Sequence, residues 1–147
     1  MNFDTFKIEK RNIKTVEYQA LRKTTGWDML DDSIVEKALK NDLFSLCIYD
    51  KEKLVGMGRV IGDGFIYFYI QDIIVIPEYQ KKGVGKLIME NIEEYLSEAT
   101  NNNSFIGLMA AVDVKDFYTK FDYQVAEGMQ IVTPSMGTRS INLDLDI

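Results

Sequence analysis

A glycine-containing turn with three lysines is the stretch whose residue types and spacing point most directly to chemistry. Residues 80–86 read Gln-Lys-Lys-Gly-Val-Gly-Lys and follow an apolar run at 73–76, which Pro77 ends. An amphipathic segment comes next, so the turn is expected to open a helix. The first turn of a helix carries unpaired N–H groups and the positive end of the helix dipole. Because Gly83 and Gly85 have no side chains to obstruct the backbone, the turn predicts a site for a diphosphate ligand.

The same turn also has a structural interpretation, in which the glycines serve a tight geometry and the lysines serve solubility. Two other phosphate-binding motifs do not fit the sequence. The dinucleotide fingerprint requires a third glycine at the position of Ile88. The P-loop requires a glycine, four residues and then Gly-Lys-Ser/Thr, and no such run occurs in the chain.

Three strands joined by short turns are predicted before this turn. They span residues 44–49, 53–61 and 65–76, and each is rich in apolar residues. The run Gly62-Asp63-Gly64 between the last two strands is a strong hairpin signal. Gly56 and Gly58 in the middle strand indicate a bulge or the close approach of a bulky group.

The remaining elements lie on either side of this core. Residues 3–10 predict an opening strand, and helices are expected from Thr15 and near Ser33, where Ser33 and Glu36 have capping-box spacing. After the long amphipathic helix, the pattern predicts a buried strand at 105–111, a short helix capped by Asp113, and closing strands at 129–133 and 140–145. This order of elements predicts an α/β fold with a mixed sheet.

Two motifs in this order resemble the landmarks of one known family. Gln-Lys-Lys-Gly-Val-Gly, preceded by Asp-Ile-Ile-Val-Ile-Pro-Glu-Tyr, resembles the acetyl-CoA-binding signature (Gln/Arg-x-x-Gly-x-Gly/Ala) of the GCN5-related N-acetyltransferases, or GNAT family. Residues 116–123 resemble the family's second landmark, an aromatic Phe-Tyr run, with Asp122 where the family usually has glycine. The resemblance covers nearly the whole chain. It implies one domain over residues 1–147, with a mostly antiparallel mixed sheet flanked by about four helices.

The resemblance also implies a cofactor and its binding residues. In the family, the pyrophosphate of acetyl-CoA lies on the backbone of the turn, and the pantetheine arm pairs with the edge of the preceding strand. Backbone N–H groups near Ile74 would then polarise the thioester carbonyl. Carried over residue by residue, the cofactor-binding positions are Ile74, Val75, Ile76, Gln80, Lys81, Lys82, Gly83, Val84, Gly85 and Lys86.

Three further residues are candidates for roles in the site. Tyr118 matches the position of the general acid that protonates the CoA thiolate, although its helical stripe with Phe117 and Phe121 also suits core packing. Asp72 is a candidate base, beside Glu78, a tyrosine or a water chain, and a structural hydrogen-bonded role is favoured for it. Trp27 lies in the joint between the first two helices, where it serves either as a substrate wall or as a plug beneath the loop.

Composition excludes several other kinds of chemistry. The chain has 147 residues, one cysteine and no histidine, which removes Ser-His and Cys-His catalysis and leaves no ordinary zinc site, so no metal is expected. Cys47 lies in an apolar run and is expected to be buried and inert, so no covalent acyl-enzyme is expected. A net charge of −6 disfavours nucleic-acid binding. No apolar run has membrane-spanning length and the first residues do not form a signal peptide, so a cytoplasmic location is expected.

The sequence therefore leads to one principal hypothesis and one alternative. The principal hypothesis is an acetyl-CoA-dependent N-acetyltransferase that acts on a primary amine of a small molecule or peptide by direct attack in a ternary complex. The alternative is a CoA-binding or sensory module with the same fold and little catalysis. The sequence does not identify the acceptor amine. Dimerisation is common in the family, so a homodimer is one expectation, although no stretch of the sequence identifies an interface.

Overall fold

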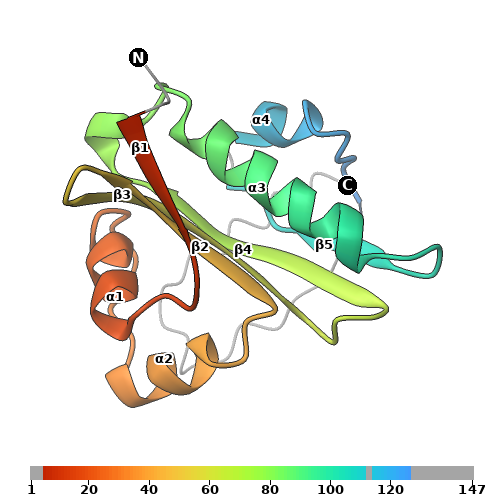
Figure 1. Ribbon diagram of the computed structural model, residues 1–147, viewed down its shortest axis with the longest axis horizontal. Coiled ribbons are helices and arrows are strands. Elements are labelled where there is room, and N and C mark those ends of the chain that lie inside the picture. The colour runs from red at the N-terminus through yellow and green to blue at the C-terminus, as the bar shows by residue number, and fades with distance from the viewer. Residues whose placement is uncertain (1–4, 112–113, 127–147) are drawn as a thin grey trace. The chain divides into compact units, whose positions relative to one another are not determined.

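The computed structural model describes residues 5–111 and 114–126, and the chain divides into two compact units, Met1–Leu108 and Met109–Ile147. The described residues of the first unit form a five-stranded sheet, three α-helices and a short 3₁₀ helix at Pro77–Tyr79 (Figure 1). Its elements in chain order are β1 (Phe6–Lys10), α1 (Thr15–Lys23), α2 (Asp32–Leu39), β2 (Phe44–Asp50), β3 (Lys53–Gly62), β4 (Tyr67–Val75), α3 (Val84–Ala99) and β5 (Phe105–Leu108). The second unit contributes α4 (Lys115–Thr119). The expectation of one domain over residues 1–147 stays a prediction.

The sheet has the predicted mixed and mostly antiparallel topology. Its strand order is β1-β2-β3-β4-β5, with antiparallel pairs throughout except for the parallel pair β4–β5. A parallel pair needs a crossover connection, and α3 lies in that connection. Within the first unit, α1 and α2 lie on one face of the sheet and α3 lies on the other (Figure 1). These findings confirm the predicted α/β class.

The hairpin between β3 and β4 forms as predicted, and its geometry explains where β4 begins. The Asp63 carboxylate accepts hydrogen bonds from three successive amides, those of Phe65, Ile66 and Tyr67, at 2.8–3.0 Å. These contacts tie Phe65 and Ile66 into the turn, so β4 begins at Tyr67 and not at Phe65. Gly64 takes a φ of +83°, a left-handed conformation that glycine adopts without strain.

The predicted cap of α2 and the predicted end of β5 are also wrong, and some expectations fall on residues outside the described ranges. The N-cap of α2 is Asp31, whose carboxylate accepts the Ser33 amide at 2.8 Å, and not Ser33 itself. The strand β5 ends at Leu108 and does not continue to residue 111. Asp113, the closing strands at 129–133 and 140–145, and the first residues of the opening strand lie outside the described residues.

Gly56 and Gly58 of β3 allow α3 to approach the sheet closely. A Cβ atom built on Gly58 would lie 2.7 Å from Cγ2 of Ile88 and 2.9 Å from Cδ1 of Ile73. A Cβ atom on Gly56 would lie 3.1 Å from side-chain atoms of Val84 and Ile88. The β2–β3 register shifts beside Gly56, where Val55 is the extra residue of β3, and the β3–β4 register shifts beside Gly58, where the extra residue is on β4. Both predicted functions of these glycines are therefore confirmed.

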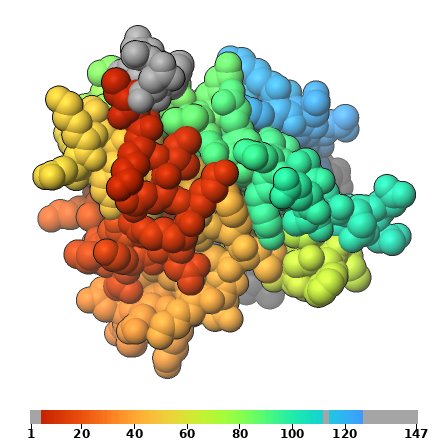
Figure 2. Space-filling model, in the orientation of Figure 1, coloured from red at the N-terminus to blue at the C-terminus, as the bar shows by residue number. Residues whose placement is uncertain are grey.

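The apolar face of α3 fills one side of the core, and its other face is solvent-exposed. The side chains of Val84, Ile88, Met89, Ile92 and Leu96 are almost fully buried. Charged residues such as Lys86 and Glu90 lie on the outer face, which is visible in green across the front of Figure 2. Burial of the apolar face holds α3 against the sheet. The first turn of α3 therefore has a fixed position just after the end of β4. In residues 5–111 and 114–126, no helix is both long and apolar enough to cross a membrane.

Candidate active site

The first turn of α3 is an uncapped helix terminus. Gly83 is its N-cap residue with a φ of +88°, and no side chain accepts a hydrogen bond there. The first helical bond runs from the Leu87 amide to the Gly83 carbonyl at 3.0 Å, so the amides of Val84, Gly85 and Lys86 lack a helical acceptor. The helix has no acidic residue in its first turn.

The other two longer helices, α1 and α2, each have acidic side chains at the N-terminus, which neutralise the positive end of the helix. Glu17 stands in the first turn of α1 and accepts the Lys14 amide at 2.9 Å. Asp31 caps α2, and Asp32 adds a second carboxylate to its first turn. Only α3 of these three helices presents its positive end without a carboxylate, which suits an anion supplied from outside the chain.

The lysines predicted to assist this terminus lie around it on the surface. Lys81, Lys82 and Lys86 are all exposed, and Lys81 takes a left-handed φ of +61°. The Lys82 ammonium lies 5.4 Å from the ring centroid of Tyr79. Lys86 and Glu90 approach to 3.8 Å with exposed side chains, so their attraction is weak and leaves Lys86 able to contact a phosphate.

The strand that leads to this turn has an unpaired edge. Tyr67–Ile70 of β4 pair with Phe105–Leu108 of β5, and no described strand pairs with β4 beyond Ile70 on that side. The amides of successive residues in an extended strand point to opposite edges. Because the Ile76 amide donates to the Val55 carbonyl of β3 at 3.0 Å, the Val75 amide points to the unpaired edge.

The structure refines the predictions for Ile74 and Gln80. By the same rule, the Ile74 amide points toward β3, so the free donor near Ile74 is the amide of Val75. The Gln80 side chain donates to the Val75 carbonyl at 3.0 Å, and it thereby closes the turn onto the strand end. Gln80 thus has a structural contact in addition to its predicted place in the cofactor turn.

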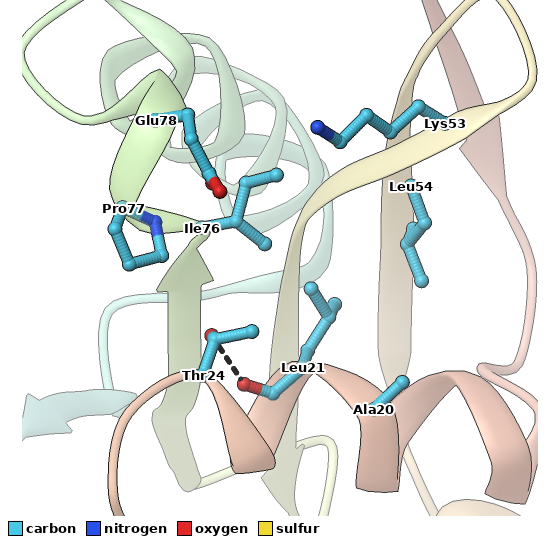
Figure 3. Close-up of a pocket in the computed structure, with 8 residues that line it drawn as sticks. All are labelled: Ala20, Leu21, Thr24, Lys53, Leu54, Ile76, Pro77 and Glu78. Atoms are coloured by element: carbon cyan, nitrogen blue, oxygen red, sulfur yellow. Dashed lines mark hydrogen bonds between the residues drawn. The ribbon is translucent and has the colours of Figure 1, made fainter.

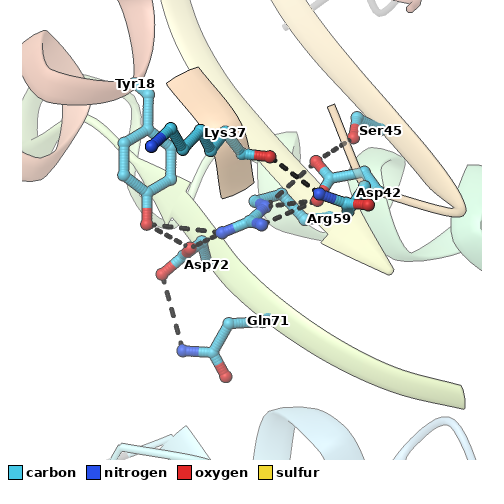
Figure 4. A network of polar contacts seen from close by, with 8 residues as sticks. Tyr18, Lys37, Asp42, Ser45, Arg59, Gln71 and Asp72 are labelled. Atoms are coloured by element: carbon cyan, nitrogen blue, oxygen red, sulfur yellow. Dashed lines mark hydrogen bonds and ion pairs between the residues drawn. The ribbon is translucent and has the colours of Figure 1, made fainter. Parts of the chain in front are cut away.

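Asp72 belongs to a buried polar network at the bulge of β4 (Figure 4). Its carboxylate accepts the Tyr18 hydroxyl at 2.6 Å and the Arg59 guanidinium at 2.9 Å. Arg59 also contacts both carboxylate oxygens of Asp42 at 2.7–3.1 Å. Burial and the nearby Asp72 charge raise the pKa of Tyr18 to about 12. Asp72 has a φ of +56°, so the network also holds an unusual backbone conformation.

Trp27 lies in the connection between α1 and α2, where it was predicted. Its side chain is 41% exposed, and its ring centroid lies 5.3 Å from the guanidinium carbon of Arg22. Thr25 holds the loop, because its hydroxyl accepts the Trp27 amide at 3.0 Å. Partial exposure over a buried cation is compatible with both predicted roles, the substrate wall and the plug.

Tyr118 belongs to the second unit and lies in a cluster of aromatic rings. Its ring centroid is 5.0 Å from that of Phe117 and 6.4 Å from that of Tyr123. Burial raises the pKa of Tyr118 to about 12. Asp122, which replaces the family's usual glycine, takes a left-handed φ of +68°. Aspartate tolerates this conformation better than most residues, so the substitution preserves the turn.

The first unit also contains a pocket that the sequence did not predict. It has a volume of about 470 Å³ and lies where the end of α1, the start of β3 and the residues after β4 meet (Figure 3). Its lining is formed by Ala20, Leu21, Thr24, Lys53, Leu54, Ile76, Pro77 and Glu78. These positions come from three separate segments, and none carries a local signal for a pocket. The described residues contain no cluster of three or more Cys, Asp or Glu side chains that could hold a metal ion.

Comparisons with known proteins agree with this geometry. Residues 12–133 match a family model described as an acetyltransferase (GNAT) domain. An uncharacterized N-acetyltransferase of Pyropia yezoensis, ycf52, is 30% identical over 124 residues, which are 82% of this chain and 70% of that protein. The YjcF protein of Bacillus subtilis, also an uncharacterized N-acetyltransferase, is 34% identical over 88 residues, 59% of this chain and 60% of that protein.

Solved structures share both the fold and part of the sequence. A protein of unknown function from meticillin-resistant Staphylococcus aureus, described as a probable acetyltransferase, is 36% identical with a TM-score of 0.80. The match covers 87% of this chain and 99% of that one. A GNAT family acetyltransferase of Streptococcus pneumoniae is 27% identical with a TM-score of 0.72, over 88% of this chain and 98% of that one. The chain therefore belongs to the GNAT family of N-acetyltransferases.

Proposed function

We propose that the protein transfers an acetyl group from acetyl-CoA to a primary amine of a small molecule or peptide, by direct attack in a ternary complex. The observation that carries this proposal is the uncapped N-terminus of α3 directly after the unpaired edge of β4. An anion site next to a free strand edge suits a ligand with a diphosphate at one end and an amide-containing arm at the other. Acetyl-CoA has this chemistry.

The predicted cofactor residues divide into two groups in this proposal. The backbone amides of Val84, Gly85 and Lys86 bind the pyrophosphate, and the lysines Lys81 and Lys82 add positive charge. At the strand end, the Val75 carbonyl is the acceptor for the pantetheine arm, since the amides of Ile74 and Ile76 point toward β3. Binding would require the arm to displace the Gln80 side chain from the Val75 carbonyl or to pair beside it.

The Val75 amide is the proposed donor to the thioester oxygen. It points to the unpaired edge, where the negative charge of a tetrahedral intermediate would develop. One well-placed donor of this kind stabilises the transition state by about 3 kcal/mol.

Tyr118 is the proposed general acid. A phenol is protonated at neutral pH at its ordinary pKa of about 10, and burial raises the pKa of Tyr118 further, to about 12, so the side chain holds a proton for the departing thiolate. The structure favours a structural role for Asp72 over that of a base, since Tyr18 and Arg59 already occupy one of its oxygens and Gln71 lies 3.5 Å from the other. We therefore expect the amine to bind in its neutral form or to lose its proton through water.

A thiol-release assay tests this function. Wild-type protein with acetyl-CoA should release CoA thiol when a suitable amine from a broad panel is added. Tyr118→Phe should lower kcat at least about a hundredfold without weakening CoA binding. Tyr95→Phe is the matched control, because Tyr95 stacks on Phe44 at 4.7 Å on the far part of α3. Binding of acetyl-CoA without turnover of any amine would favour the sensory module instead.

A further inference from the structure

Arg22 is a buried cation whose hydrogen-bonding capacity is largely unused. It lies near the end of α1, and its side chain is among the largest that are fully buried, at 1% exposure. Its Nη2 donates to the Asp28 carbonyl at 3.0 Å. Its Nε and Nη1 are buried and have no hydrogen-bond partner among the described residues, and no described carboxylate forms an ion pair with it. A buried charge without a counter-ion is costly to the fold.

The other two arginines of the first unit, Arg11 and Arg59, each form ion pairs with two carboxylates, so their charges are neutralised. Arg59 contacts Asp42 at 2.7 Å and Asp72 at 2.9 Å. Arg11 contacts Glu9 at 2.7 Å and Glu17 at 2.9 Å. An unsatisfied buried donor in a native protein calls for an explanation, and a missing ligand is one that chemistry supports.

The surroundings of Arg22 favour a small anion with a single charge. The guanidinium carbon lies 5.7 Å from the Tyr18 ring centroid and 5.3 Å from that of Trp27, so aromatic rings stabilise the cation without using its N–H groups. The nearby cation Arg59 is already balanced by two carboxylates. One free guanidinium matches the charge of a carboxylate, whereas a phosphate dianion would need a second cation.

We propose that Arg22 binds the carboxylate of the acceptor, so that the preferred substrates are amino acids and not simple alkylamines. This inference rests on the proposed function and on the prediction that Trp27, in the joint between α1 and α2, forms a wall of the acceptor site. Trp27 covers the guanidinium from that joint and is 41% exposed, so a carboxylate reaches the buried N–H groups when this indole moves aside. Tyr18 connects the same cation to β4, since its hydroxyl donates to Asp72 at 2.6 Å.

Paired substrates test the carboxylate on the wild-type protein. A panel of α-amino acids is assayed by thiol release, each beside its carboxamide and beside the amine that lacks the group. We expect kcat/KM to be at least about a hundredfold higher for the acid than for the amide, because the amide leaves the buried cation unpaired. Equal values for acid and amide, with turnover present, would overturn the inference. A comparable gain for phosphoethanolamine over ethanolamine would also overturn it, because the ligand would then be a phosphate.

Variants separate a binding role of Arg22 from a structural one. Arg22→Met should keep or raise the Tm, because methionine needs no hydrogen bonds, and it should abolish the preference for the acid. Lys23→Met removes one exposed positive charge beside it and should leave both quantities unchanged. A clear fall in the Tm of Arg22→Met with the preference intact would show that Arg22 is structural.

A binding measurement keeps this inference separate from the proposed function. N-acetylated amino acids, which carry the carboxylate but no amine, should raise the Tm of the wild type and not that of Arg22→Met. The absence of thiol release from every amine would refute the proposed function and would leave the role of Arg22 unaffected. The absence of any shift with the N-acetylated amino acids would refute the role of Arg22, whatever the activity.

Discussion

Removal of the Arg59 side chain should destabilise the protein strongly. Arg59→Met would leave the carboxylates of Asp42 and Asp72 buried without a cation, at side-chain exposures of 1% and 2%. Burial alone would lower the pKa of Arg59, but hydrogen bonds to Asp42 and the charges of both carboxylates outweigh this effect and raise the pKa. Breaking a buried pair in this way costs about 3–5 kcal/mol. For a chain of this length, that corresponds to a fall in Tm of about 10–15 °C.

Urea and thermal unfolding of three variants measure this effect. Arg59→Met should show the full loss, and the triple variant with Asp42→Asn and Asp72→Asn should recover part of it, because the uncompensated charges are gone. Lys53→Met is the matched control on the same strand, since Lys53 is exposed, and it should change the free energy of unfolding by less than about 0.5 kcal/mol. A free energy for Arg59→Met within about 1 kcal/mol of the wild type would refute the reasoning.

Two further perturbations test the packing of α3 and the charge pairing at α1. Gly58→Ala should lower the free energy of unfolding by about 1–3 kcal/mol, since its Cβ would lie 2.7 Å from Cγ2 of Ile88; unchanged urea unfolding would contradict the close approach. Burial alone would raise the pKa of Glu17, but hydrogen bonds from Arg11 and Tyr49 outweigh it and lower the pKa to about 2 from the usual 4.5. The stabilisation from ionised Glu17 is complete above about pH 4.5 and is lost as the pH falls toward 2. Acid unfolding followed by circular dichroism should show this loss in the wild type and not in Glu17→Gln, and identical profiles would contradict it.

The elements of the fold were predictable because their signals are local. The Gly62-Asp63-Gly64 turn forms through contacts of Asp63 with amides two to four residues away. Apolar spacing placed α3 against the sheet, and the glycines of β3 signalled its close approach. The cap of α2 could not be predicted from the sequence in this way. Asp31 and Ser33 are both residue types that cap helices, and the backbone conformation determines that Asp31 is the cap.

The candidate site was predictable only where it is made of one segment. The turn at 80–86 could be found because strand, glycines and helix are consecutive. The network around Asp72 joins residues far apart in the chain, since Tyr18 and Asp72 are 54 positions apart, and no local pattern announces such a contact. Arg22 was missed for the same reason, because an arginine near a helix end normally lies in solvent and its burial depends on Tyr18 and Trp27.

The most direct test of the account is a calorimetric titration of acetyl-CoA into wild type, Gly85→Ala and Gly85→Glu. Gly85 lies in the first turn of α3 and, unlike Gly83, does not have a positive φ, so both substitutions fit the helix without backbone strain. We predict saturable binding by the wild type and Gly85→Ala, and no binding by Gly85→Glu, whose carboxylate would occupy the positive helix end. Absence of binding by the folded wild-type protein, or equal binding by Gly85→Glu, would contradict the proposed cofactor site.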